Sequence, residues 1–165
     1  MSTVFQAQRL AILVDTSNMY HASKHKFKAR LDYKQLLQFV KKDRALIRAI
    51  AFVEKTEDTD LNPFIDALKS SGFETRVRTA RRHADGKVIY GSWDVGMALH
   101  VVQLIPKVDC IAIVSGNGKL VDILDFLSQH GVRSEVYGVE GYVASDLIYQ
   151  ADESFMLNED CILRS

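Results

Sequence analysis

Short hydrophobic runs alternate with amphipathic stretches along most of the chain. Strands are predicted at 10–14, 46–53, 73–77, 110–114 and 132–139, with a short edge strand at 154–157. The run 46–53 is nearly continuously apolar, which is typical of a strand covered on both faces. Helical spacing of apolar residues predicts helices that begin near Asp32 and Pro63, and further helices over 93–104, 119–129 and 144–150. This alternation predicts a three-layer α/β/α fold with a mostly parallel sheet of five or six strands.

The first hydrophobic run, 10–14, ends at Asp15 and is followed by polar residues that include Asn18. The segment after it is either a loop or a helix. In open α/β sheets, ligands bind in the crevice at the carboxyl ends of the strands. We therefore expect Asp15 and Asn18 to lie at the mouth of a site that binds a polyanion.

Further polar residues are expected at the same edge of the sheet. Ser115 and Asn117 follow the strand 110–114, and Asp94 lies in the first turn of the helix before it. Oxygen ligands of this kind suit Mg²⁺ or Mn²⁺, which can hold a phosphodiester and activate water. Each residue also has a structural interpretation, because acids cap helices and Ser-Gly-Asn-Gly is a common turn. Their shared placement favours a site.

Two basic clusters, within 24–30 and 76–83, follow the first and third predicted strands. Basic side chains that flank an acidic pocket suit a ligand with a phosphate backbone, and the residues expected to contact it are Lys24, Lys26, Arg78, Arg81 and Arg82. The alternative is a solvated face, and the acidic loop at 54–60 counts against a uniformly positive groove. Three aromatic residues have two open interpretations, because they could stack on bases or belong to the core. They are Tyr20, Phe27 and Trp93.

Amino-acid composition and motif searches exclude several classes of protein but do not indicate a binding partner. Lys plus Arg and Asp plus Glu each number 21, so net charge neither favours nor opposes nucleic acid. The two cysteines have no metal spacing, and Cys110 is expected in the core. No Walker A, dinucleotide, zinc or Gly-x-Ser-x-Gly motif occurs. Because the N-terminus has no long apolar segment, we expect a cytoplasmic protein with no membrane partner.

Four pieces of the sequence, taken in order, resemble the NYN domain family in its bacterial LabA-like branch. These are Ile-Leu-Val-Asp-Thr-Ser-Asn at 12–18, Trp-Asp-Val-Gly-Met-Ala-Leu-His at 93–100, Ile-Val-Ser-Gly-Asn-Gly at 113–118, and Gly-Val at 131–132 with Ala-Asp at 151–152. The resemblance implies a PIN-like ribonuclease fold in a single domain of residues 1–165, with its core at about 10–157. Members are thought to be Mg²⁺-dependent RNA-processing nucleases, some with regulatory roles.

The resemblance also implies an acidic catalytic pocket lined by Asp15, Asn18 and Asp94, with Ser115 beside it. The family usually shows Ser-Gly-Asp-x-Asp-Phe after the fourth strand, where this chain has Asn117 and Lys119 in place of the two acids. The family's lysine shortly before the second acid is also missing. Fewer anionic ligands predict weak binding of Mg²⁺ or Mn²⁺.

The leading hypothesis is a metal-dependent ribonuclease-like domain in which Asp15 and Asp94 hold the ion. Asn18 and Asn117 would orient water or phosphate, Ser115 would support the scissile group, and Lys119 either contacts phosphate or points to solvent. The alternative is an RNA-binding or regulatory module that kept the pocket and lost turnover. A third hypothesis is a phosphatase-type hydrolase acting on nucleotides. The sequence leaves the formation of homo-oligomers open.

Overall fold

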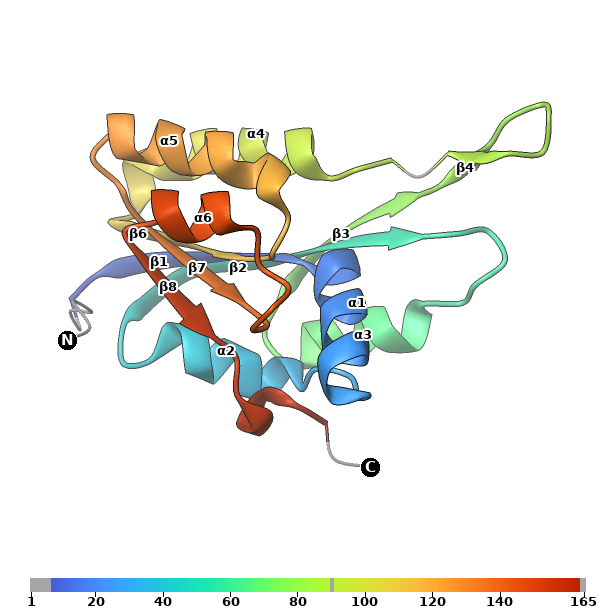
Figure 1. Cartoon of the computed structure of the whole chain (residues 1–165), viewed down its shortest axis with the longest axis horizontal. Helices are drawn as coiled ribbons and strands as arrows, with labels where there is room; N and C mark the ends of the chain where they lie inside the picture. Colours follow the sequence, from blue (N-terminus) through green and yellow to red (C-terminus); the bar gives the residue numbers. More distant parts are fainter. Residues whose placement is uncertain (1–6, 90, 164–165) are drawn as a thin grey trace.

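The computed structural model describes residues 7–89 and 91–163. In this part of the chain, six strands form one sheet in the order β3-β2-β1-β6-β7-β8, and every neighbouring pair is parallel (Figure 1). The strands are β1 (Arg9–Asp15), β2 (Ala45–Lys55), β3 (Glu74–Thr79), β6 (Cys110–Val114), β7 (Arg133–Gly138) and β8 (Glu153–Met156). The predicted parallel sheet and its edge strand are confirmed.

Helices cover both faces of this sheet, which confirms the three-layer arrangement expected of a PIN-like fold (Figure 1). One face carries α1 (Thr16–Phe27), α2 (Tyr33–Lys41) and α3 (Asn62–Ser70), and the other carries α4 (Asp94–Leu104), α5 (Val121–Gln129) and α6 (Ser145–Gln150). Short 3₁₀ turns lie at Ile105–Lys107, Gly118–Leu120 and Glu159–Cys161. None of the helices in the described ranges is long and apolar enough to cross a membrane.

The central strand β1 explains why its sequence is almost entirely apolar. Ile12 and Val14 point into the core under α1 to α3, whereas Ala11 and Leu13 point into the core under α4 to α6. All four side chains are fully buried. A strand covered on both faces has no solvent side on which to place polar residues, so the alternation of polar and apolar residues disappears.

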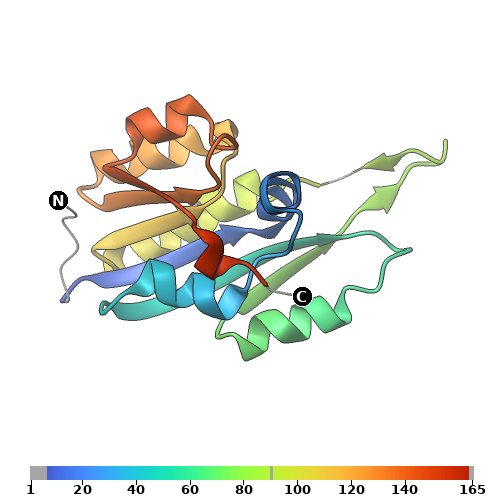
Figure 2. The ribbon, with the colours of Figure 1, turned by 60° about the horizontal axis from the view of Figure 1, so that its bottom comes forward.

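The structure differs from the expected elements mainly after three strands. The segment after β1 is a helix, α1, rather than a loop, and β2 and β3 each continue two residues further than predicted, to Lys55 and Thr79. Beyond β3, a small antiparallel hairpin of β4 (Arg81–Arg82) and β5 (Val88–Ile89) projects from the body of the molecule (Figures 1 and 2). The sequence also indicates a short run at 87–90 after the turn at Asp85-Gly86, and its last residue, Tyr90, lies outside the described residues.

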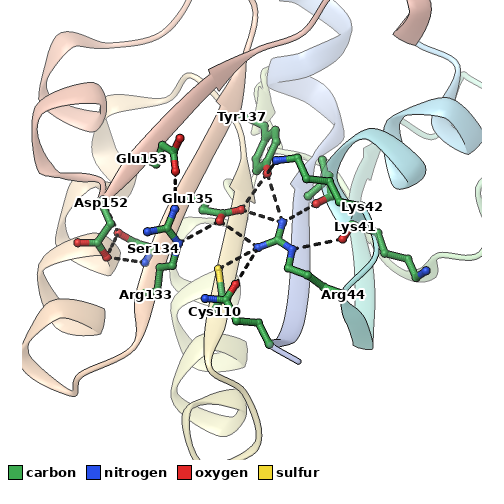
Figure 3. Close-up of polar contacts among 12 residues, drawn as sticks. Lys41, Lys42, Arg44, Cys110, Arg133, Ser134, Glu135, Tyr137, Asp152 and Glu153 are labelled. Atoms are coloured by element: carbon green, nitrogen blue, oxygen red, sulfur yellow. Dashed lines mark hydrogen bonds and ion pairs between the residues drawn. The ribbon is translucent and has the colours of Figure 1, made fainter. Parts of the chain in front are cut away.

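A buried ion pair joins the segment that enters β2 to strand β7 (Figure 3). Both side chains of the pair, Arg44 and Glu135, are fully buried, and two N–H groups of Arg44 each donate to a Glu135 carboxylate oxygen at 2.9 Å. The Tyr137 hydroxyl and Arg133 also donate to Glu135. Burial alone would raise the pKa of Glu135, but these donors outweigh it and hold that pKa below its ordinary value.

Cys110 lies beside this pair, at the start of β6. Its Sγ is 3.7 Å from the Arg44 guanidinium, and the residue is fully buried, as expected of a core cysteine. Burial raises the pKa of its thiol to about 12, so the group stays protonated and unreactive. The network therefore connects the segment that enters β2 with strands β6 and β7, and it offers no nucleophile.

Candidate active site

A polar pocket of about 320 Å³ lies where the sheet order changes direction, at the carboxyl end of β1. The chain winds from β1 outward through β2 to β3, and then returns to place β6 on the other side of β1. Such a switch point leaves a crevice between the two outgoing loops. The pocket is lined by Asp15, Ser17, Asn18, His21, Phe52, Glu54, Ser92, Trp93, Asp94 and Asn117.

Asp15, the last residue of β1, occupies the centre of this site. One carboxylate oxygen accepts the backbone N–H of Asn18 at 3.2 Å and so caps α1, and the other accepts the Ser115 hydroxyl at 3.3 Å. Burial raises the pKa of Asp15, and the negative charge of Asp94 adds to this effect, while the two hydrogen bonds oppose it. Asp15 therefore caps α1 and also lines the pocket.

Asn18 links α1 to the turn after β6. Its side-chain oxygen accepts the backbone N–H of Gly116 at 2.8 Å. A Cβ atom on Gly116 would lie 1.9 Å from the carbonyl oxygen of Tyr142, so a side chain at this position is excluded sterically. The glycine of the Ser-Gly-Asn-Gly turn is thus required by close backbone packing, and it brings the turn within reach of α1.

Asn117 and Asp94 meet across the pocket. The Asn117 amide donates to an Asp94 carboxylate oxygen at 3.2 Å, while the Asn117 side-chain oxygen accepts the backbone N–H of Lys119. The Asp94 backbone N–H is bound in turn by the Ser92 hydroxyl at 3.1 Å. The structure therefore brings together four of the residues selected from sequence, although they come from three separate segments.

Ser115 lies in a different position from that expected, and Lys119 takes the second of its two expected positions, which points to solvent. Ser115 is fully buried behind Asp15, and its Oγ donates to Asp15 and accepts the backbone N–H of Asn117. Ser115 orients Asp15 and does not line the pocket. Its position therefore does not favour direct contact with the scissile group. Lys119 is exposed outside the pocket lining.

Glu54 is a third carboxylate of the pocket that the sequence interpretation assigned to a loop. It belongs to β2, where the register pairs Phe52 with Asp15, so Glu54 extends beyond the end of β1 on the same strand face as Phe52. One of its carboxylate oxygens, Oε1, is buried and has no hydrogen-bond partner among the described residues. Burial raises the pKa of Glu54, and the charge of Asp15 adds to this, against the opposing effect of Arg78.

Trp93 lines the pocket, and Arg78 lies against its ring. The guanidinium carbon of Arg78 lies 4.0 Å from the Trp93 ring centroid, and its Nη1 donates to the Ser92 carbonyl at 2.7 Å. The Trp93 indole N–H donates to the carbonyl of Val53, and its ring packs on Phe52. Trp93 is therefore anchored as part of the core and covered by Arg78, which does not favour stacking on a base.

The remaining basic residues lie further from the acids. Arg82 belongs to β4 of the projecting hairpin and forms an ion pair with Asp58. Lys24 and Lys26 are in the last turn of α1, roughly 14–17 Å along the helix from Asp15 by the helical rise. Lys26 lies 4.0 Å from Glu140. The structure thus places Arg78 against Trp93 of the pocket lining, puts Arg81 and Arg82 on the projecting hairpin, and does not bring the α1 lysines to the pocket.

The donor set determines whether a divalent cation fits. Three carboxylates, from Asp15, Glu54 and Asp94, line one small pocket, and oxygen ligands of this type are those that Mg²⁺ and Mn²⁺ prefer. The unpartnered oxygen of Glu54 and the raised pKa values of Asp15 and Glu54 indicate a site short of positive charge. Within the described ranges, no three His, Cys, Asp or Glu side chains are already gathered around a metal position. The chemistry of the three carboxylates fits a divalent cation.

Comparison with known proteins decides the family. A sequence model of the NYN domain matches residues 9–158. The chain belongs to the NYN domain family. This NYN domain is 24% identical over 162 residues to "Low amplitude and bright protein LabA" from Synechococcus elongatus, covering 94% of this chain and 87% of the relative. The relative's name states no reaction.

A solved structure supports the fold of this NYN domain. The protein of unknown function VPA0982 from Vibrio parahaemolyticus superposes with a TM-score of 0.86 at 26% identity, over 98% of this chain and 100% of the other. The arrangement of sheet and helices described above therefore extends along the whole of a related chain. Assignment of the individual site residues rests on the geometry of the pocket.

Proposed function

We propose that the chain acts as one NYN domain that hydrolyses RNA phosphodiester bonds with Mg²⁺ or Mn²⁺. The observation that carries the proposal is the convergence of Asp15, Glu54 and Asp94 on one pocket at the switch point of the sheet. Three carboxylates that repel one another are costly for the fold unless a cation neutralises them. When bound, the ion would place positive charge beside the phosphate and would lower the pKa of its bound water.

Each residue of the site would have a role that follows from its position. Asp15, Glu54 and Asp94 would hold the cation, and Asn18 would present its amide to phosphate or water, because its oxygen is already bound by Gly116. Ser115 would keep the Asp15 carboxylate in place. Arg78, beside Glu54, would offer the positive charge nearest to the pocket for a phosphate of the RNA backbone.

A second function of the same fold has its own supporting observation. Asn117 and Lys119 stand where relatives carry acids, and the Asn117 side chain uses both its oxygen and its amide in bonds within the protein. A pocket with these residues could retain RNA and bind metal too weakly for turnover. In that case the protein would be a regulatory RNA-binding module.

The decisive experiment incubates the protein with labelled single-stranded and hairpin RNA in Mn²⁺, in Mg²⁺ and in EDTA. We expect metal-dependent cleavage that is lost in Asp15→Asn, which keeps the helix cap. A matched control is Asp66→Asn, an exposed acid on α3 outside the pocket lining. Equal cleavage by wild type and Asp15→Asn would overturn the assignment. RNA binding without cleavage or metal uptake would favour the regulatory module, and hydrolysis of small phosphate esters alone would indicate a phosphatase.

A further inference from the structure

A second cavity, larger and less polar than the acidic pocket, lies among α1, α2, α3 and the C-terminal segment. Its volume is about 600 Å³, and its walls include Tyr20, Tyr33, Phe64, Ala67 and Leu163. Tyr20 and Ser23 face this cavity, while Ser17, Asn18 and His21 face the acidic pocket, so different faces of α1 border the two spaces. The cavity is therefore a separate site, next to the first across one helix.

The size and walls of this cavity are those of a ligand site. Protein interiors are closely packed and seldom leave voids larger than a water molecule, whereas ligand pockets measure roughly 300–1,000 Å³ and are mostly apolar. The aromatic wall is held rigidly, because Tyr33 packs edge-to-face on Phe64 at 5.7 Å and on Phe73 at 5.9 Å between ring centroids. A flat apolar group can lie against such a wall without reorganising it.

Several polar residues also line this mainly apolar space, and the three that bear on the charge of a ligand are Arg30, Asp32 and Tyr33. Arg30 is exposed, and its guanidinium forms no ion pair with any residue of the described ranges. The Tyr33 hydroxyl likewise makes no hydrogen bond there, and burial raises its pKa, so it stays protonated and able to donate. The nearby Asp32 carboxylate is engaged through one oxygen by the backbone N–H groups of Lys34 and Gln35. The polarity therefore favours a ligand with an anionic group that reaches Arg30.

We propose that this cavity binds a planar aromatic molecule that carries an anionic group, with the size and chemistry of a purine mononucleotide. The base lies against Tyr33 and Phe64, and the phosphate pairs with Arg30. Two ligands have this chemistry: a free mononucleotide and the terminal nucleotide of an RNA strand. The site requires no metal, so it does not depend on the proposed nuclease activity.

The test uses the full-length protein in EDTA, so that metal-mediated binding at the acidic pocket is absent. Saturation-transfer NMR and calorimetry compare AMP with adenosine and with ribose 5-phosphate. We expect AMP to bind about tenfold or more tightly than either half of the molecule. No binding of AMP at millimolar concentration, or equal binding of ribose 5-phosphate, would overturn the proposal.

Variants locate the site. Ala67→Phe fills the cavity from an exposed position of α3, so the fold should tolerate it, and AMP affinity should fall at least about tenfold. Arg30→Gln should reduce AMP affinity to that of adenosine, while Lys34→Gln, an exposed cation outside the cavity lining, should not. Binding that survives Ala67→Phe but is lost in Asp15→Asn would assign AMP to the acidic pocket and overturn the proposal.

A 5′-phosphorylated oligoadenylate distinguishes the two sources of ligand. If it binds as tightly as AMP and its binding is lost in Ala67→Phe, the cavity holds an RNA terminus. If AMP binds and the oligonucleotide does not, the cavity holds a free nucleotide. If the oligonucleotide binds wild type and Ala67→Phe equally and AMP does not bind, the cavity is not a nucleotide site.

Discussion

The side-chain amide of Asn117 donates to a carboxylate oxygen of Asp94 at 3.2 Å, although the two residues lie on different elements and 23 positions apart. Asn117 follows β6, and Asp94 begins α4. Because an amide carries no charge, Asn117 holds Asp94 by a hydrogen bond where a carboxylate at position 117 would repel it. An amide also gives the proposed cation one anionic ligand fewer than an acid would.

Asn117→Asp is expected to tighten Mn²⁺ binding and to destabilise the metal-free protein. A new charge in contact with the cation contributes about 1.4 kcal/mol, which corresponds to an affinity gain of about tenfold. In EDTA, the same charge repels Asp94 and lowers the melting temperature. Calorimetric titration with Mn²⁺ and thermal melts measure the two effects. Asn62→Asp, at an exposed position of α3, is the matched control, and unchanged Mn²⁺ affinity in Asn117→Asp would show that residue 117 is not near the ion.

Glu54→Gln tests the carboxylate that the structure adds to the site. We expect Mn²⁺ affinity to fall by roughly tenfold to hundredfold, and RNA cleavage to fall with it. Metal-free stability at neutral pH should hold or rise, because the raised pKa of Glu54 shows that its charged form is disfavoured in the folded protein. The neighbouring exposed acid in Glu57→Gln serves as control. Loss of both metal binding and stability would instead indicate a structural role.

The hairpin arginines are tested by salt dependence. Replacing Arg81 and Arg82 together by Gln should weaken RNA binding at low salt and reduce the slope of log affinity against log salt by about 1.4, since each phosphate contact to a single strand contributes about 0.7. Asp58→Asn should strengthen binding, because it frees Arg82 from its ion pair. A double replacement of Lys69 and Lys107, two exposed cations away from the hairpin, is the control. An unchanged slope would remove the hairpin from the RNA interface.

The buried pair of Arg44 and Glu135 predicts the response of stability to acid. The pKa of Glu135 is lower in the folded than in the unfolded chain, so its contribution is present above the ordinary value of 4.5 and is lost as pH falls through the folded value. Glu135→Gln should cost about 3–5 kcal/mol at neutral pH, because it leaves Arg44 buried without its counter-charge. Its stability should then fall less steeply below pH 4.5 than that of wild type.

Denaturant unfolding at a series of pH values measures this difference. Glu153→Gln removes a partly exposed acid that pairs with Arg133, so it provides a matched control with a much smaller expected effect. If Glu135→Gln and Glu153→Gln lose equal stability at neutral pH, the burial of the pair does not govern its strength. If Glu135→Gln retains the acid dependence of wild type, another carboxylate is responsible.

Local patterns in the sequence were sufficient for most of the fold. The run 10–14 predicted a strand buried on both faces, and its abrupt end at Asp15 marked the sheet edge at which open α/β sheets generally bind ligands. Asp15, Asn18, Asp94 and Asn117 could be selected because each follows or precedes a predictable element. These inferences succeed because hydrophobic periodicity and capping residues depend on neighbours within a few positions of the chain.

Tertiary structure alone decided how the strand ends are aligned. Glu54 enters the pocket because the register of β2 against β1 pairs Phe52 with Asp15, and a register between distant strands is not set by local pattern. Ser115 lies behind Asp15 and the Asn117 amide reaches Asp94 for the same reason. The cavity beside Tyr33 also exists only once three helices and the C-terminal segment have packed, because its walls come from segments far apart in the chain.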